Sequence, residues 1–205
     1  MFFLNLFFRA FRYSTLLFIE KVTNVISKVR FKSYVSISGG FNILGPCHIY
    51  VAKTAKMTVG KNFNLVSSHL INPLCTHPST ISVGDGANVI IGDNVGMSSS
   101  TIWIRKGLIV GNNVNFGGGT VVLDSDAHSL NYLDRRDGLK DMANRVDKEI
   151  VIDDDVLIGM NTIILKGVHI GARSIIGAGS VVAKDIPCDC VAAGNPARVI
   201  KMINQ

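Results

Sequence analysis

The sequence has few cysteines, and none of the spacings that cysteines use for covalent or metal chemistry. Its four cysteines, Cys47, Cys75, Cys188 and Cys190, include no CxxC pair, and the Cys188-Asp-Cys190 spacing suits neither a disulfide nor a metal clip. This pattern argues against a disulfide framework. It predicts reduced thiols in a cytosolic protein.

The N-terminal segment lacks an apolar run of transmembrane length. Its longest uncharged stretch is residues 1–8, whereas roughly 20 apolar residues are needed to span a bilayer. Beyond residue 8, the charged residues Arg9, Arg12, Glu20 and Lys21 interrupt the apolar sequence. A secretory signal has positive charges before its apolar core and a small-residue cleavage site after it. This segment has neither feature. We therefore expect neither a transmembrane helix nor a secretory signal.

Acidic residues are almost missing from residues 1–32. Six Lys and Arg residues accompany Glu20 alone, so this segment carries +5 of the chain's net charge of +6. Its polar positions fall near one helical stripe, and the apolar ones form a broad remainder; the stripe comprises Asn5, Arg9, Arg12, Glu20, Asn24 and Lys28. The pattern predicts one or two amphipathic helices.

Two roles for residues 1–32 remain open. A basic face with aromatic neighbours suits peripheral contact with anionic lipid headgroups at the inner face of a membrane. The alternative is packing on the rest of the chain or on another subunit. Nucleic acid is not expected as a partner, because the remainder of the chain is nearly neutral and has no basic stripe.

A six-residue repeat dominates residues 33–205. Aliphatic residues recur at every sixth position over residues 152–182; they are Ile152, Ile158, Ile164, Ile170, Ile176 and Val182. This period fits neither an α-helix nor a hairpin sheet, but it is typical of a parallel β-helix of hexapeptides. Twenty glycines against five prolines agree with a chain that turns sharply every few residues. We predict one β-helix domain over residues 33–205.

The repeat is interrupted near a histidine. From Val110 the six-residue steps pass through Phe116 and Val122 to His128, which would then lie above Val110, eighteen residues earlier. The pattern disappears over residues 129–149, a polar and charged segment that predicts an excursion loop. Long loops in compact domains commonly carry function.

His128 is the predicted catalytic residue. Asp124 and Asp126 lie within four residues of it. Imidazole can act as a general base near neutral pH, and a carboxylate can fix its tautomer and stabilise the imidazolium. We assign Asp126 to that second role. Within the loop, Arg145 is a candidate contact for a sugar or an anionic acceptor.

A zinc site is not expected. The γ-class carbonic anhydrases resemble this chain in their period, but their zinc requires three histidines, two of them closely spaced. The five histidines of this sequence include no pair about five residues apart.

Several segments together resemble the hexapeptide-repeat acetyltransferases, including those that act on maltose, galactosides and nodulation factors, and especially the capsule and lipopolysaccharide O-acetyltransferases. The segments are VGMSSSTI (95–102), DSDAHS (124–129), IGMNTI (158–163), IGAGSVVAKDIP (176–187) and AGNPARVIK (193–201). The resemblance covers residues 55–203.

The resemblance implies a fold, an assembly and a cofactor site. It implies a left-handed β-helix with a short C-terminal helix, and a homotrimer with active sites at subunit interfaces. It also implies acetyl-CoA as co-substrate, with no metal and no acyl-enzyme. By matching motif, residues of the last coils and the C-terminus contact coenzyme A; these are Met160, Ala178, Ala183, Lys184, Arg198 and Lys201.

Two departures from the galactoside enzymes bear on the acceptor. Leu157 stands where those enzymes carry a tryptophan, and Ser98 stands where they carry a substrate-binding asparagine. We expect Ser98, Asp124 and Arg145 to contact an acceptor that is not a simple galactoside.

The expected activity is acetyl-CoA-dependent O-acetylation of a sugar or lipid-linked glycan intermediate in surface polysaccharide synthesis. Two alternatives stay open, N-acetylation of an amino sugar and a non-catalytic β-helix scaffold.

Overall fold

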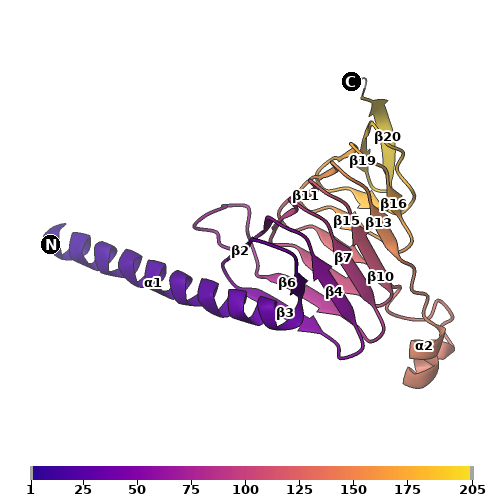
Figure 1. The fold of residues 1–205 in the computed structure, drawn as a ribbon, viewed down its shortest axis with the longest axis horizontal. Coiled ribbons are helices and arrows are strands. Elements are labelled where there is room, and N and C mark those ends of the chain that lie inside the picture. The colour runs from indigo at the N-terminus through magenta and orange to yellow at the C-terminus, as the bar shows by residue number, and fades with distance from the viewer. Residues whose placement is uncertain (1, 204–205) are drawn as a thin grey trace.

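The chain winds into a triangular prism with one β-sheet on each side. The computed structural model describes residues 2–203, with side chains from residue 14 onward. Strands one coil apart pair in parallel within each sheet, so the repeats form a left-handed parallel β-helix, an exception to the right-handed crossover rule. Figure 1 shows the coils stacking from the end next to α1 (Phe2–Tyr34) toward the C-terminus. The predicted fold class is confirmed.

Within residues 2–203, three sheets contain twenty strands. Sheet A contains β1 (Ser36–Ile37), β4 (Lys56–Val59), β7 (Asn88–Ile91), β10 (Gly107–Val110), β13 (Ile150–Ile152) and β16 (His169–Ile170). Sheet B contains β2 (Phe41–Leu44), β5 (Phe63–Val66), β8 (Gly96–Ser98), β11 (Asn115–Phe116), β14 (Leu157–Ile158), β17 (Ile175–Ile176), β19 (Cys190–Gly194) and β20 (Ala197–Met202). Sheet C contains β3 (Cys47–Val51), β6 (Ser79–Val83), β9 (Thr101–Ile104), β12 (Val121–Leu123), β15 (Ile163–Ile164) and β18 (Val181–Val182).

The aliphatic residues of the six-residue repeat form the core of the prism. All six aliphatic residues from Ile152 to Val182 are at most 1% exposed. Equivalent residues of successive coils pair directly, as Ile152 does with Ile170 and Ile158 with Ile176. Burying such side chains contributes on the order of 1.5–3 kcal/mol each. The repeat therefore stabilises the fold coil upon coil.

A ladder of asparagines closes the corner between sheets A and B. Asn62, Asn94 and Asn113 have φ angles of 57° to 58°, a left-handed conformation that asparagine tolerates better than most residues. Their side chains hydrogen-bond in series at 2.9 and 3.0 Å, and Asn113 donates to Asp155 of the next coil at 3.0 Å. This corner is structural, because its polar groups are used within the ladder.

The stacking predicted for His128 is wrong. Val110 pairs with Ile152, not with His128, because the chain leaves the coil directly after β12 and re-enters it at β13. The excursion therefore spans residues 124–149 rather than 129–149. His128 lies inside it and is exposed.

A second excursion, residues 67–78 between β5 and β6, was not predicted. It leaves the corner between sheets B and C and packs back on later coils. Asn72 donates to Ser98 Oγ at 3.3 Å, and a β-carbon on Gly118 would lie 2.8 Å from the carbonyl oxygen of Leu74. Only glycine at position 118 lets the loop lie this close.

The N-terminal helix caps the open end of the β-helix. The helical prediction is confirmed for residues 2–32 as a single helix, α1, which packs on β2 and β3; residue 1 lies outside the described residues. Phe31 is fully buried there and stacks on Phe41 and Phe63 with ring centroids 5.8 and 5.5 Å apart. The terminal coil of a solenoid needs such a cap, because its core would otherwise face water.

The predicted C-terminal helix is wrong. Residues 197–202 form β20, which pairs antiparallel with β19. This hairpin gives β19 a hydrogen-bonded neighbour where another coil would otherwise have been required. The β-branched pair Val199 and Ile200 also favours a strand.

Candidate active site

The excursion over residues 124–149 is held in shape by two short helical segments, η1 (Asp134–Arg136) and α2 (Gly138–Asn144). Asp137 caps α2, its side chain accepting two backbone N–H groups of the first turn. Asp134 accepts hydrogen bonds from Ser129 Oγ at 2.8 Å and from Asn144 Nδ2 at 2.9 Å. These contacts fix α2 beside the start of the excursion, where His128 lies.

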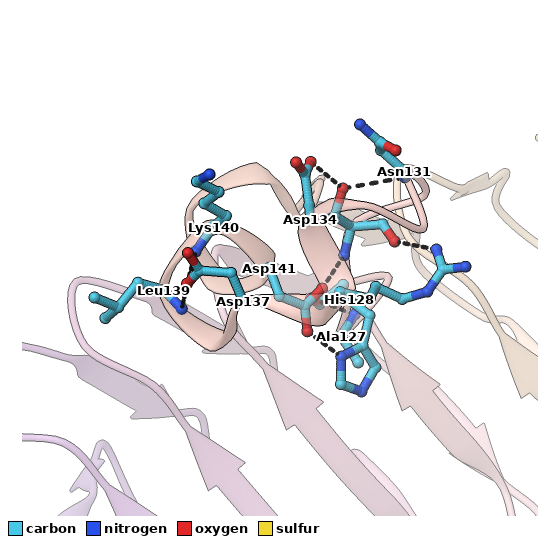
Figure 2. Close-up of polar contacts among 11 residues, drawn as sticks. Ala127, His128, Asn131, Asp134, Asp137, Leu139, Lys140 and Asp141 are labelled. Atoms are coloured by element: carbon cyan, nitrogen blue, oxygen red, sulfur yellow. Dashed lines mark hydrogen bonds and ion pairs between the residues drawn. The ribbon is translucent and has the colours of Figure 1, made fainter.

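His128 pairs with an aspartate that comes thirteen residues later in the chain. Figure 2 shows Asp141 pointing from α2 toward the imidazole, with its Oδ2 2.6 Å from His128 Nδ1. The other oxygen, Oδ1, accepts the backbone N–H of Ser129 at 2.7 Å. The Asp141 side chain is 12% exposed and that of His128 is 68% exposed. The hydrogen bond from His128, followed by that from Ser129, lowers the pKa of Asp141.

This pair is suited to general-base chemistry. An ionised Asp141 can only accept a hydrogen bond, so its partner must be Nδ1–H, and the histidine tautomer that it favours leaves the lone pair on Nε2. The same carboxylate stabilises the imidazolium that forms when Nε2 takes a proton. Geometry thus assigns Asp141 the role that sequence reasoning gave to Asp126.

Asp126 has a different partner. Its Oδ1 lies 2.7 Å from Lys166 Nζ, on the following coil, and its Oδ2 is buried without a hydrogen-bond partner within the described part of the chain. The prediction that Asp126 orients His128 is therefore wrong in this geometry. The intervening Ala127 has a φ of 64°, and the chain turns there before reaching His128.

Asp124 is a structural residue, contrary to the prediction that it contacts the substrate. It is fully buried and accepts the backbone N–H groups of Arg105, Lys106 and Gly107 at 2.7, 2.7 and 2.8 Å. Burial raises the pKa of the Asp124 carboxyl, and the three N–H donors oppose that shift. A substrate has no access to a side chain enclosed in this way.

The other two predicted acceptor residues lie on separate elements. Ser98 ends β8, is half-buried and accepts the hydrogen bond from Asn72. Arg145 directly follows α2, and its Nε lies 3.2 Å from Asp147 Oδ2. Each is thus tied to one of the two excursions.

Four of the predicted cofactor residues flank sheet C. Met160 and Ala178 occupy the corner between sheets B and C in successive coils, where Met160 accepts the backbone N–H of Gly179 at 2.8 Å. Ala183 and Lys184 follow β18 at the opposite edge and are exposed. Ala183 lines one groove with Asp126 and Lys166. The structure therefore brings the coil residue Ala183 next to the start of the excursion.

The remaining two predicted cofactor residues, Arg198 and Lys201, are exposed on the C-terminal strand β20. Within residues 14–203, neither they nor Lys184 forms an ion pair with a carboxylate. Their charges are therefore available to an anionic ligand.

Sequence reasoning missed Asp141 and Lys166. Asp141 is far from His128 in sequence, and the only local indication was Asp137, a favourable N-cap that predicts a short helix with an acid in its first turn. Lys166 occupies an ordinary turn between two hexapeptides. Among the described residues, no group of three or more His, Cys, Asp or Glu side chains could hold a metal ion.

The lowered pKa of Asp141 has a consequence for stability. Because the folded pKa lies below the ordinary value of 3.8, the Asp141–His128 contact stabilises the fold above that value and ceases to do so as the pH falls through the folded pKa. The difference in free energy of unfolding between wild type and Asp141→Asn is expected to shrink from about pH 6 to about pH 3. Urea titrations at both pH values measure it, and an undiminished difference would contradict the contact.

Comparison with known proteins agrees with this architecture. Residues 149–184 match the family model described as bacterial transferase hexapeptide (six repeats). A 55-residue stretch is 53% identical to 2,3,4,5-tetrahydropyridine-2,6-dicarboxylate N-acetyltransferase of Clostridium perfringens (strain SM101 / Type A); the match covers 27% of this chain and 23% of that relative. The chain thus spans about a quarter of that curated relative.

Two solved structures resemble most of the chain. One is a hexapeptide-repeat-containing acetyltransferase of Vibrio cholerae O1 biovar eltor complexed with acetyl coenzyme A; its TM-score is 0.52 at 29% identity, over 85% of this chain and 74% of the other. The other is a galactoside acetyltransferase in complex with coenzyme A, with a TM-score of 0.52 at 29% identity, over 86% and 70% of the two chains.

Proposed function

We propose, on the premise that this chain belongs to the hexapeptide-repeat acetyltransferases, that it transfers acetyl from acetyl-CoA to a hydroxyl of a sugar or glycan intermediate in surface polysaccharide synthesis. The observation that carries the proposal is the His128–Asp141 pair, with its contact of 2.6 Å, on an excursion beside the C-terminal coils. Similar structures bind acetyl-CoA or coenzyme A.

In the proposed mechanism, His128 carries one proton from the acceptor hydroxyl to the leaving thiolate, and Asp141 supports it. Nε2 of His128 accepts the proton of the acceptor hydroxyl while the hydroxyl oxygen attacks the acetyl carbonyl carbon. The C–S bond then breaks, and the thiolate leaves with the proton returned from His128. Asp141 holds the imidazole and stabilises its charged form. No cysteine is required, since the acetyl group passes directly to the acceptor.

The residues proposed for coenzyme A fit a long, anionic co-substrate. Met160, Ala178 and Ala183 are small or flexible side chains beside sheet C, over which an extended chain can pass. Lys184, Arg198 and Lys201 supply exposed positive charge for phosphates. Acetyl-CoA would contribute the activated thioester.

A homotrimer is the proposed assembly. A single chain leaves the His128 side chain 68% exposed, whereas acyl transfer benefits from a site that excludes water. The coil faces carry exposed aliphatic residues that a neighbouring subunit could cover, among them Ile90, Leu157 and Ile163. We place the enzyme in the cytoplasm, with residues 1–32 contacting the membrane peripherally.

A thiol-release assay tests the proposed activity. Acetyl-CoA is incubated with the full chain and a panel of sugars, amino sugars and glycolipids, and the products are analysed by mass spectrometry. Turnover with a hydroxyl acceptor supports the proposal. Transfer only to amines would favour the N-acetyltransferase alternative, for which the Clostridium perfringens relative is a precedent. A complete absence of turnover would favour the scaffold alternative.

Substituting each aspartate by asparagine distinguishes the two candidate partners of His128, Asp141 and Asp126. Asp141→Asn is expected to lower kcat/KM by about 10- to 100-fold, because it removes the charge that favours the required tautomer and the imidazolium. Asp126→Asn is expected to lower it less, since Asp126 contacts Lys166 rather than the imidazole. Steady-state kinetics on both variants measures the difference; a larger loss in Asp126→Asn would restore Asp126 as the partner.

A further inference from the structure

Helix α1 presents its polar side to the protein. Asn24 Oδ1 accepts the backbone N–H of Gly45 at 2.5 Å, and Ser27 Oγ accepts that of Cys47 at 3.2 Å. Together with the buried Phe31, these residues define the face that packs on β2 and β3. The inner face of α1 is thus fixed by hydrogen bonds to the terminal coil and by one aromatic residue.

The opposite side of α1 is apolar and uncovered. Phe18, Val22, Val25, Ile26 and Val29 are between 42% and 67% exposed. In Figure 1, α1 runs outward from the end of the β-helix, with most of its length away from the coils. A row of large apolar side chains along a helix is characteristic of a surface that meets another apolar phase. We call these five residues the outer face of α1.

Basic residues border the outer face on both sides. At 100° per residue, Lys21, Lys28 and Lys32 lie along one margin and Arg30 lies along the other. Within the described side chains, none of the four forms an ion pair. An apolar face with lysine and arginine at its margins complements a bilayer with anionic headgroups, since the apolar side chains enter the acyl boundary and the cations meet the headgroups.

The loop of residues 67–78 adds further exposed apolar side chains beside α1. Leu70, Ile71 and Leu74 in its tip are 44%, 49% and 48% exposed. Leu70 lines a groove together with Leu16 and Ile19 of α1. The same loop is bonded to Ser98 through Asn72 and covers Gly118 through Leu74. One loop therefore joins the helix to the proposed acceptor residue.

We propose that the outer face of α1 and the tip of the 67–78 loop form one docking surface for an anionic lipid bilayer. Docked in this way, α1 lies in the membrane plane, in keeping with the finding that none of the described helices is long and apolar enough to cross a bilayer. The loop that holds Ser98 through Asn72 is then part of the membrane-contacting surface. An acceptor attached to a lipid would approach from that side, a consequence that rests on the proposed function.

Vesicle flotation of the full chain tests the surface. The probes are phosphatidylcholine vesicles with and without phosphatidylglycerol at about 30%. Wild type is expected to float with the anionic vesicles only. Val25→Glu/Val29→Glu is expected to reduce bound protein at least about tenfold, and Leu70→Glu/Leu74→Glu several-fold. Leu139→Glu, at a residue 83% exposed on α2, is the matched control and should float as wild type does.

Three results would overturn the proposal. The first is that wild type does not bind anionic vesicles. The second is that the Val25→Glu/Val29→Glu protein floats as well as wild type does. The third is that the Leu139→Glu control loses as much vesicle binding as the helix variant does. Light scattering measures the mass of the assembly. If wild type does not bind vesicles and the Val25→Glu/Val29→Glu variant has a smaller mass than wild type, the outer face is a contact between copies of the chain. Protein that floats but fails in the thiol-release assay refutes the proposed activity and leaves the docking surface intact.

Discussion

Replacing His128 with alanine is expected to lower kcat/KM for acetyl transfer by about a thousandfold, roughly 4 kcal/mol of transition-state stabilisation. The acceptor hydroxyl is a poor nucleophile unless its proton is removed as it attacks, and in the proposed mechanism Nε2 of His128 takes that proton. The side chain is 68% exposed and takes no part in the core, so the variant should fold and bind coenzyme A as wild type does.

The chain supplies a matched control for this experiment. His169 also pairs with an aspartate, its Nε2 lying 2.9 Å from Asp153 Oδ2, and its side chain is 53% exposed. It lies on β16, outside both excursions, and has no contact with His128 or Asp141, so His169→Ala should retain nearly full activity. Steady-state rates of thiol release measure both variants. Undiminished turnover in His128→Ala, or an equal loss in His169→Ala, would remove His128 from the mechanism.

Asp124→Ala is expected to destabilise the fold by about 3 kcal/mol or more, because three hydrogen bonds from backbone N–H groups to a buried carboxylate disappear together. These bonds fix residues 105–107, which lead into β10, and they also set the point where the chain leaves the coil. Urea unfolding followed by circular dichroism, at one fixed protomer concentration, measures the change.

Two companion variants make the result interpretable. Asp124→Asn keeps one acceptor oxygen and should lose less stability than Asp124→Ala. Asp153→Ala removes a half-buried carboxylate whose partner is the exposed His169, and should cost no more than about 1 kcal/mol. If Asp124→Ala were as stable as Asp153→Ala but inactive, Asp124 would be a substrate contact after all.

The fold was predictable because its determinant is periodic. An aliphatic residue at every sixth position can be buried in every coil by only one arrangement, a three-sided helix in which equivalent residues stack eighteen apart. The regular spacing of aliphatic residues from Ile152 to Val182 is visible within one continuous segment of the sequence. The C-terminal hairpin was missed because β20 pairs antiparallel to a neighbour and has no repeat of its own; five of its six residues are exposed.

The candidate site was predictable only in part. Interruption of the repeat pointed to His128 and to a loop, but not to the carboxylate that contacts the imidazole. Asp126 is two residues from His128, yet Ala127 turns the chain between them, and Asp126 pairs instead with Lys166. Asp141 meets His128 because the excursion folds back, which sequence distance does not reveal.

By itself, the sequence determined the six-residue coil, the N-terminal helix and the position of the histidine, because each depends on residues close together along the chain. Only the tertiary structure decided which aspartate contacts His128, that Asp124 accepts three backbone N–H groups inside the fold, and that α1 turns its apolar side away from the protein. Those outcomes depend on which groups meet after the chain has folded back on itself, and hydrogen-bond partners remote in sequence decide them.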